Sequence, residues 1–97
     1  MKFEWDEARN RANIRKHALD FADAEEMFRG LRVVDPDTQE EYGERRWTGV
    51  GSICARIVYL VFTEPGTDTV RIISLRKAGS RERKRYQKTI QDRLEAG

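Results

Sequence analysis

The sequence predicts a single α+β domain in which two N-terminal helices and a C-terminal helix pack on a four-stranded antiparallel sheet. Three observations support this fold class. Apolar residues recur at helical spacing before residue 30, β-branched runs separated by short turn sequences fill residues 31–76, and a second helical pattern follows Gly79. No repeat, linker or low-complexity segment divides the 97 residues, so we expect one domain over residues 1–97.

The first two helices should occupy residues 6–30. Asp6 can cap the first helix, which should end near His17, and Trp5 stands where an apolar side chain packs back on the helix. This helix contains few large apolar residues, so one of its faces should stay in water. A second, short helix should begin after Asp20 and end at Gly30, because apolar residues recur there at helical spacing: Phe21, Ala24, Met27 and Phe28.

Four strands should follow, over residues 31–34, 45–50, 56–63 and 69–76. The first should stop at Asp35-Pro36-Asp37, a turn sequence in which proline cannot continue a central ladder. The last three strands are joined by short links and should pair as an antiparallel meander. The C-terminal helix should open at Gly79-Ser80 and turn one apolar stripe inward: Tyr86, Ile90 and Leu94.

Charge is divided unevenly along the chain. Residues 71–97 hold nine basic and three acidic residues, a net charge of +6, whereas residues 1–70 hold ten basic and fourteen acidic residues, a net charge of −4. A cluster of positive charge creates a local field that favours polyanions. Nucleic acid is therefore the first candidate partner.

Composition excludes several other classes. The single cysteine, Cys54, cannot form an internal disulfide, which favours a reducing cytoplasm, and we expect it to be a buried or turn thiol. The longest apolar run, residues 57–62, is too short to span a membrane. The chain has no glycine-rich phosphate loop, no cysteine or histidine pairs at metal spacing and no serine–histidine–acid set. We therefore expect a cytoplasmic protein with no metal, no cofactor and no membrane contact.

The remaining reactive residues suit metal-independent cleavage of RNA. In that reaction the ribose 2′-hydroxyl attacks the adjacent phosphate, and the enzyme supplies a proton acceptor, cations for the added negative charge and a proton donor. Histidine is the residue type best suited to proton transfer near neutral pH, so His17 could accept or donate the proton. Arg71 and Arg76 could bind phosphate through two hydrogen bonds each. Tyr86 or Lys16 could act as a donor.

Each candidate also has a purely structural explanation. His17 stands where the first helix should end, and the helix dipole favours a cation there. Tyr86 belongs to the apolar stripe, and Glu82 suits the first turn of a helix. In a regular strand Arg71 and Arg76 would point to opposite faces unless a bulge intervenes, and Arg76 is the better candidate because it lies beside the basic helix.

Two groups of residues resemble the BrnT toxins of type II toxin–antitoxin modules. Both occur in the same order as in that family and together span most of the chain. The first is Phe3-Glu4-Trp5-Asp6, then Asn13 and Lys16-His17, then Phe21 and Phe28; the second is Arg71-Ile72-Ile73-Ser74, then Arg76, Ala78, Glu82 and Tyr86. The resemblance implies a RelE-like fold, a ribonuclease that inhibits translation and growth, and neutralisation by a BrnA-type antitoxin. Because that antitoxin carries the DNA-binding domain, contact with DNA should be indirect.

The resemblance also implies site residues. The catalytic candidates are the matching motif positions Arg76, His17, Lys16, Tyr86 and Glu82. Arg71 matches the motif as an RNA-binding residue, Trp5 would offer a base-stacking surface, and the basic helix region supplies the other RNA contacts: Lys77, Arg81, Arg83, Lys84 and Arg85. One position departs from the family, which commonly has glycine after the Lys-His pair. Here Ala18 disfavours a positive φ, so the first helix is expected to end differently.

Two other functions fit the charge pattern. The basic segment would suit a non-catalytic module that grips nucleic acid, with an affinity that falls steeply with salt. It would equally suit recognition of an acidic partner protein. Which of the candidate residues acts as acid or base stays open at the level of sequence.

Overall fold

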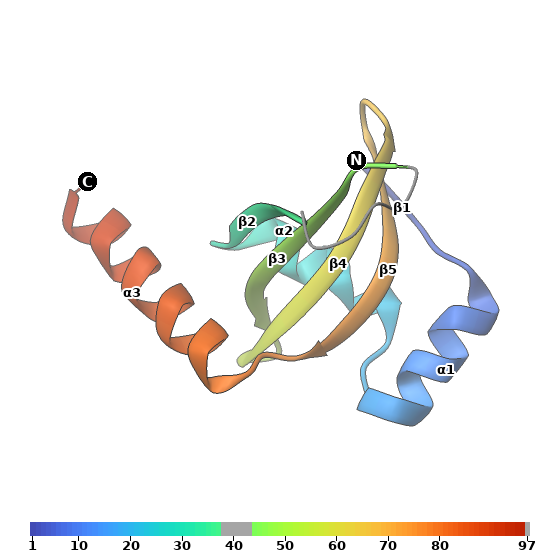
Figure 1. The fold of residues 1–97 in the computed structure, drawn as a ribbon, viewed down its shortest axis with the longest axis horizontal. Helices are drawn as coiled ribbons and strands as arrows, with labels where there is room; N and C mark the ends of the chain where they lie inside the picture. Colours follow the sequence, from blue (N-terminus) through green and yellow to red (C-terminus); the bar gives the residue numbers. More distant parts are fainter. Residues whose placement is uncertain (38–43, 97) are drawn as a thin grey trace.

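The computed structural model describes residues 1–37 and 44–96. In chain order, its elements are β1 (Lys2–Glu4), α1 (Glu7–His17), the 3-10 helix η1 (Phe21–Asp23), α2 (Ala24–Arg29), β2 (Val33–Asp37), β3 (Arg46–Ile53), β4 (Arg56–Gly66), β5 (Thr69–Lys77) and α3 (Ser80–Ala96). The predicted class, a small α+β domain with two N-terminal helices and a C-terminal helix, is confirmed (Figure 1).

The sheet has five strands in the order β1-β5-β4-β3-β2, not the predicted four. The additional strand is β1, which pairs in parallel with β5 so that Lys2 lies opposite Thr69. Its three residues are too few to show an alternating pattern, so the sequence alone does not reveal it. The last three strands form the predicted antiparallel meander.

The strand β2 corrects the prediction of a turn at residues 35–37. It continues through Asp35 and Pro36 to Asp37, and Pro36 lies opposite Trp47 of β3. Proline is tolerated here because β2 is an edge strand, which needs ladder hydrogen bonds on one side only.

The helices α1, η1 and α2 pack on one side of the sheet, and α3 extends away from the strands (Figure 1). The buried core lies between the sheet and the first three of these helices: Leu19, Phe21, Ala24, Met27, Ile53, Val58, Leu60, Phe62, Val70, Ile72 and Leu75. Met27 reaches the sheet because β3 has glycines beneath it. A Cβ added at Gly49 would lie 2.7 Å from Met27 Cε, and one at Gly51 would lie 2.5 Å from Met27 Cγ.

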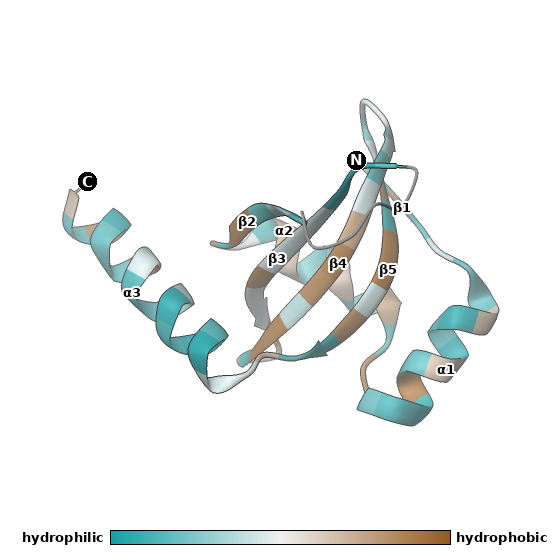
Figure 2. Cartoon of the chain, viewed as in Figure 1, coloured by the Kyte–Doolittle hydropathy of each residue, from teal (hydrophilic) through white to brown (hydrophobic). Residues whose placement is uncertain are grey.

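Residues that alternate with this core form the other side of the sheet, which we call the outer face: Thr48, Tyr59, Val61, Thr63, Arg71, Ser74 and Arg76. Figure 2 shows apolar residues recurring along β4 and β5, whereas α3 is hydrophilic over most of its length. The outer face is thus set by the same alternation that builds the core.

A bulge in β5 puts Arg71 and Arg76 on the same face. The register runs from Val61 opposite Ser74 directly to Phe62 opposite Ile72, so that one residue of β5 is extra. Arg71 therefore lies opposite Thr63, and Arg76 lies opposite Tyr59. In a regular strand the two arginines would point to opposite faces of the sheet. The sequence predicted this separation unless a bulge intervened, and the bulge is observed.

The side chain of Asn13 fastens α1 to the free edge of β5. It is buried, and its Nδ2 donates to the Leu75 carbonyl (2.8 Å) and to the Leu19 carbonyl (3.0 Å). The Leu75 N–H in turn donates to Asn13 Oδ1 (3.1 Å). This amide takes the place of a neighbouring strand, since β1 pairs only with the beginning of β5.

Both ends of α1 are capped. The Asp6 side chain accepts from the Arg9 N–H, as predicted, and Asp20 caps η1 in the same way by accepting from the Ala22 N–H. At the other end, Ala18 adopts the left-handed conformation, with φ 58°, and its N–H donates to the Ile14 carbonyl. The expectation that alanine would end this helix differently from glycine is therefore wrong. Ala18 ends the helix in the conformation that glycine usually adopts, in spite of the steric cost of a positive φ for a residue with a Cβ.

The β3–β4 connection is a tight turn of Cys54 and Ala55. Both have positive φ, 49° and 63°, as a two-residue turn between twisted strands requires. The Cys54 thiol is exposed, and its backbone N–H donates to Glu26 Oε2 (2.8 Å). Of the two alternatives predicted for this thiol, the turn is observed.

The helix α3 corrects the prediction of an inward apolar stripe. None of its described residues is buried, and Leu94 is 68% exposed. Polar contacts hold it against the first part of the chain: Arg85 pairs with Asp35 (2.7 Å), and Arg93 donates to the Arg32 carbonyl (2.9 Å). In the described part of the chain, no helix is long and apolar enough to span a membrane.

Candidate active site on the outer face

Arg76 is the centre of a compact arrangement of side chains at the end of β5. Its Nη1 and Nη2 donate to the two carboxylate oxygens of Glu82 (2.9 and 2.8 Å), and Nη1 also donates to the Lys77 carbonyl (3.1 Å). Its guanidinium carbon lies 4.0 Å from the centre of the Tyr59 ring. We call Arg76, Glu82 and Tyr59 the Arg76 cluster.

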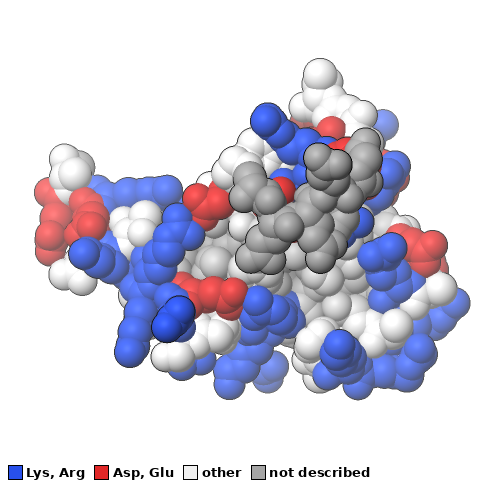
Figure 3. Space-filling view, viewed as in Figure 1, with Lys and Arg blue, Asp and Glu red and all other residues white. Residues whose placement is uncertain are grey.

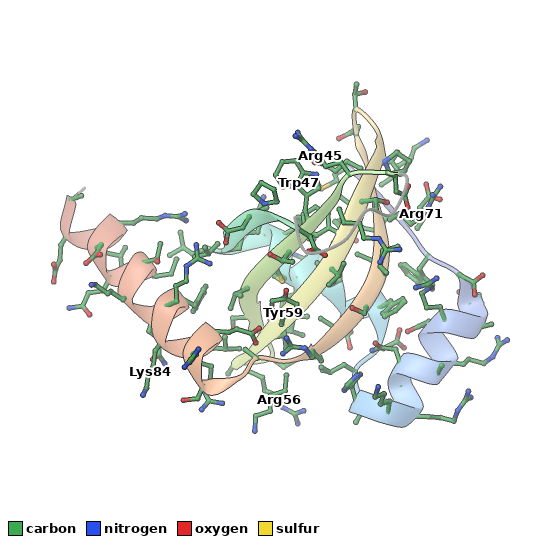
Figure 4. All side chains as sticks on the ribbon, viewed as in Figure 1. Arg45, Trp47, Arg56, Tyr59, Arg71 and Lys84 are labelled. Carbon is green, nitrogen blue, oxygen red and sulfur yellow. The ribbon has the colours of Figure 1, made fainter. Side chains whose placement is uncertain are left out.

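Secondary structure fixes each member of the cluster. Tyr59 and Arg76 are cross-strand partners on β4 and β5, so the ring and the guanidinium meet on the outer face. Glu82 lies in the first turn of α3 and accepts from the Gly79 N–H (2.7 Å), the contact of a capping box. Figure 4 shows Tyr59 on β4 close to the start of α3. The carboxylate therefore reaches Arg76 from a helix whose start it also stabilises.

Electrostatics keep this pair charged. The hydrogen bonds from the Arg76 guanidinium lower the pKa of Glu82 below its usual value, an effect that partial burial opposes and the Gly79 N–H reinforces. The same pairing raises the pKa of Arg76. Burial raises the pKa of Tyr59. At neutral pH the cluster thus holds a carboxylate, a guanidinium and a neutral phenol.

A pocket of about 150 Å³ lies beside the cluster, between α3 and strands β2, β3 and β4. It is lined by Val33, Asp35, Thr48, Val50, Tyr59, Arg81, Glu82, Arg85 and Tyr86. Drug-sized ligands usually need about 300–1,000 Å³, so this pocket can accept part of a nucleotide but cannot enclose one.

The structure brings some of the predicted catalytic residues together. Arg76 and Glu82 are in direct contact, and Tyr86 lines the same pocket as Glu82. The Tyr86 hydroxyl donates to the Leu31 carbonyl (3.0 Å) and so helps to hold α3 in place. Lys16 is exposed in the last turn of α1.

His17 is half-buried one helical turn beyond Asn13. Residues four apart share a helix face, so His17 continues the face through which α1 is bonded to the end of β5. No hydrogen bond of its ring joins it to the Arg76 cluster among the described residues. The structure thus places His17 at the same end of β5 as Arg76, but on a different element.

The predicted RNA-binding residues divide into two groups. Some are already engaged: Arg71 pairs with Glu4 (3.3 Å), Arg85 pairs with Asp35, and Arg83 donates to the Ala78 carbonyl (3.4 Å). The Trp5 ring packs edge-on against Phe21, with centroids 6.5 Å apart, and its Nε1 donates to Glu7. Others are exposed to solvent: Lys77, Arg81 and Lys84.

Sequence reasoning did not indicate Tyr59 or Asp35, and it assigned no role to the motif residue Asn13. Tyr59 had a usable signal, because it alternates with the core residues Val58 and Leu60 and so belongs to the outer face. Asp35 was assigned to a turn, and its pairing with Arg85 joins residues fifty positions apart. Among the described residues, no three histidine, cysteine or acidic side chains gather so that they could hold a metal ion.

Comparisons with known proteins bear on the family and the fold of the chain. Residues 5–82 match the model of a protein family described as the ribonuclease toxin, BrnT, of type II toxin–antitoxin systems. Among solved structures, the chain is similar to the Brucella abortus ribonuclease toxin BrnT, with a TM-score of 0.68 and 33% sequence identity. That similarity covers 82% of this chain and 99% of the Brucella chain. A search of curated protein sequences gives no significant match.

Proposed function

We propose that this chain, which belongs to the BrnT family of ribonuclease toxins of type II toxin–antitoxin systems, cuts RNA internally and without a metal ion. The 2′-hydroxyl of one ribose attacks the neighbouring phosphate, and the 5′ oxygen of the next nucleotide leaves. The observation that carries this proposal is the Arg76 cluster, a guanidinium fixed by Glu82, the Tyr59 ring and the Lys77 carbonyl, beside a pocket that Glu82 and Tyr59 line.

Arg76 supplies the positive charge that the reaction needs. The attacked phosphorus gains a fifth oxygen ligand and additional negative charge, and a guanidinium stabilises that charge best when its position is fixed beforehand. Glu82 and the Tyr59 ring provide this fixation, because they restrain the guanidinium through its Nη atoms and its face. Arg71 lies on the same face of β5 and contributes a second cation for a more distant phosphate.

Glu82 has two roles in this proposal. It positions Arg76, and because its pKa is lowered it stays ionised at neutral pH, so that it can accept the 2′ proton. A low pKa makes it a weak base, and its positioning role is therefore the larger one.

His17 and Lys16 supply proton transfer and charge from the end of α1. A histidine titrates near neutral pH, which suits the donation of a proton to the leaving 5′ oxygen. Tyr86 forms the wall of the pocket next to Glu82. The Tyr86 hydroxyl can donate a hydrogen bond to the substrate only when its hydrogen bond to the Leu31 carbonyl is broken.

The partners follow from the family. As a toxin of a type II module, the protein has a protein antitoxin and an RNA substrate. We assign the antitoxin to the BrnA type, place the pair in the cytoplasm and expect the free toxin to stop translation and growth. DNA contact then occurs only through the antitoxin.

Cleavage of single-stranded RNA in the presence of EDTA tests the proposal. The purified chain should leave 2′,3′-cyclic or 3′-phosphate ends, and Arg76→Ala should slow cleavage about 10²-fold or more, as the loss of one transition-state donor does in other enzymes. Arg76→Lys keeps the charge without the forked geometry and should recover part of the rate. Arg9→Ala, at an exposed position in the first half of α1, is the matched control.

Two results would contradict the proposal. Cleavage that stops with the chelator would assign the reaction to a metal ion. Salt-dependent RNA binding without new RNA ends would assign the chain to non-catalytic binding.

A further inference from the structure

The arginines at the candidate site are paired with carboxylates of the chain itself. Arg71 and Arg76, and Arg85 at the pocket, each bind a carboxylate within the chain, at 3.3, 2.8 and 2.7 Å. Another set of cations is exposed and has no ion pair among the described residues: Arg15, Lys16, Arg56, Lys77, Arg81 and Lys84. We call this set the basic rim.

The topology gathers the basic rim at one end of the molecule. Lys77 ends β5 opposite Val58, and the next residue, Ala78, donates its N–H to the Ile57 carbonyl (3.0 Å). The end of β5 therefore lies beside the start of β4, where Arg56 follows the tight turn. The helix α3 begins directly after β5, which adds Arg81 and Lys84.

The last turn of α1 completes the rim. Asn13 bonds α1 to Leu75 near the end of β5, and Arg15 and Lys16 follow within one turn. Figure 3 shows lysine and arginine side chains along the lower edge of the molecule, from the first turns of α3 to α1. In Figure 4, Arg56 and Lys84 point outward at this edge.

The carboxylates at this end are already engaged. Glu82 is bonded to Arg76, and Glu26 accepts from the Cys54 N–H. Asp20 accepts from Asn10 and from the Ala22 N–H. Six cations from four parts of the chain thus face water with no ion pair among the described residues, and a bound polyanion would relieve their mutual repulsion.

We propose that the basic rim is the track for the RNA phosphates that flank the cleaved bond, and that Arg56 lies in its middle. This inference rests on the proposed function, because the rim begins at Lys77, the residue next to Arg76. It adds Arg15 and Arg56, which neither the motif nor the charged C-terminal segment indicates. Arg76 holds the reacting phosphate, and the rim holds its neighbours.

RNA suits this surface better than an acidic protein does. Three of the six side chains are lysines, which are depleted at protein–protein interfaces, and the set contains no apolar residue that could form the centre of such an interface. Contacts with RNA phosphates need only positive charge placed along the path of the RNA backbone, and flexible, exposed lysine and arginine side chains provide that charge.

Binding measured without cleavage tests the track. In an Arg76→Ala background, a labelled single-stranded oligoribonucleotide is titrated at several salt concentrations. Arg56→Gln and Lys84→Gln should each lower the log–log salt slope by about 0.7, which corresponds to about fivefold weaker binding at about 0.1 M salt. Lys2→Gln removes the same charge from an exposed position on β1, which pairs with the other end of β5, and should leave affinity and slope unchanged.

Two outcomes would overturn the inference. The first is that Arg56→Gln and Lys84→Gln both bind the oligoribonucleotide with the same affinity and the same salt slope as the Arg76→Ala background protein. The second is a polyglutamate peptide that binds the background protein as tightly as the RNA does, which would assign the rim to an acidic protein. Because binding is measured without cleavage, a failure here is distinct from a failure of the nuclease proposal, which the RNA ends report.

Discussion

Removal of the Asn13 side chain is the sharpest test of how the fold positions the site. Its amide makes three buried hydrogen bonds, two to the backbone of Leu75 and one to the Leu19 carbonyl, at 2.8–3.1 Å. Asn13→Ala leaves these backbone groups without partners. Each unsatisfied group costs about 1–3 kcal/mol, so the substitution should lower the free energy of unfolding by about 3 kcal/mol or more.

That loss is large for a small domain, whose total stability is about 5–15 kcal/mol. At about 4–8 °C for each kcal/mol, the melting temperature should fall by about 12–24 °C. Thermal and urea unfolding followed by circular dichroism give both quantities. Arg11→Ala, an exposed change on the same helix, controls for helix propensity and should alter stability by less than about 0.5 kcal/mol.

Loss of the Asn13 amide should also loosen the structure locally, at the end of β5. In Asn13→Ala the Leu75 amide should exchange its hydrogen much faster, because its acceptor lies on α1 and not on a strand. Stability within about 1 kcal/mol of the parent, with an unchanged Leu75 exchange rate, would refute the claim that this amide fastens α1 to β5.

Three further predictions concern single positions. Ala18→Gly should raise the free energy of unfolding by about 1 kcal/mol, since glycine adopts the observed φ of 58° without steric cost, and an unchanged melting temperature would count against a left-handed end of α1. Gly51→Ala should destabilise the fold by about 1–3 kcal/mol in urea unfolding, because its Cβ would meet Met27 Cγ at 2.5 Å, and a neutral effect would mean that Met27 can move away. The pKa of Glu82 is lowered in the folded chain, so its pairing with Arg76 stabilises the fold above the pKa of the unfolded state, and this stabilisation is lost as the pH falls through the folded pKa. The free energy of unfolding of Arg76→Gln should therefore fall less steeply in acid than that of the parent protein. Parallel pH profiles of the two proteins would show that the pair does not affect stability.

Sequence reasoning recovers the parts of this fold that local patterns encode. The end of α1 at His17, the cap at Asp20 and the meander of β3, β4 and β5 all follow from periodicity and capping residues. The strand β1 does not, because three residues cannot show a period and their pairing partner is β5, at the far end of the chain. The stripe on α3 has helical spacing, but Tyr86 and Ile90 are only half-buried and Leu94 is exposed, because α3 extends away from the sheet (Figure 1).

The candidate site shows the same division. Arg76 could be chosen from the sequence, since it stands where a strand meets a basic helix. Its Tyr59 neighbour depends on strand register, and its pairing with Glu82 depends on the angle at which α3 leaves the sheet. Neither register nor angle is a property of a short segment. Both follow from how distant elements pack.

The bulge in β5 has a consequence for how this strand can vary among relatives. Arg71 and Arg76 are five positions apart, an odd separation, and an extra residue is what makes their side chains point the same way. Loss of one residue between them would leave a separation of four, with which a regular strand also keeps both arginines on the outer face, whereas loss of the bulge at constant length would turn one arginine toward the core. Relatives can thus keep the two arginines on one face in two ways, five positions apart with a bulge or four positions apart without one, and a substitution that straightens β5 at constant length is the change that separates them.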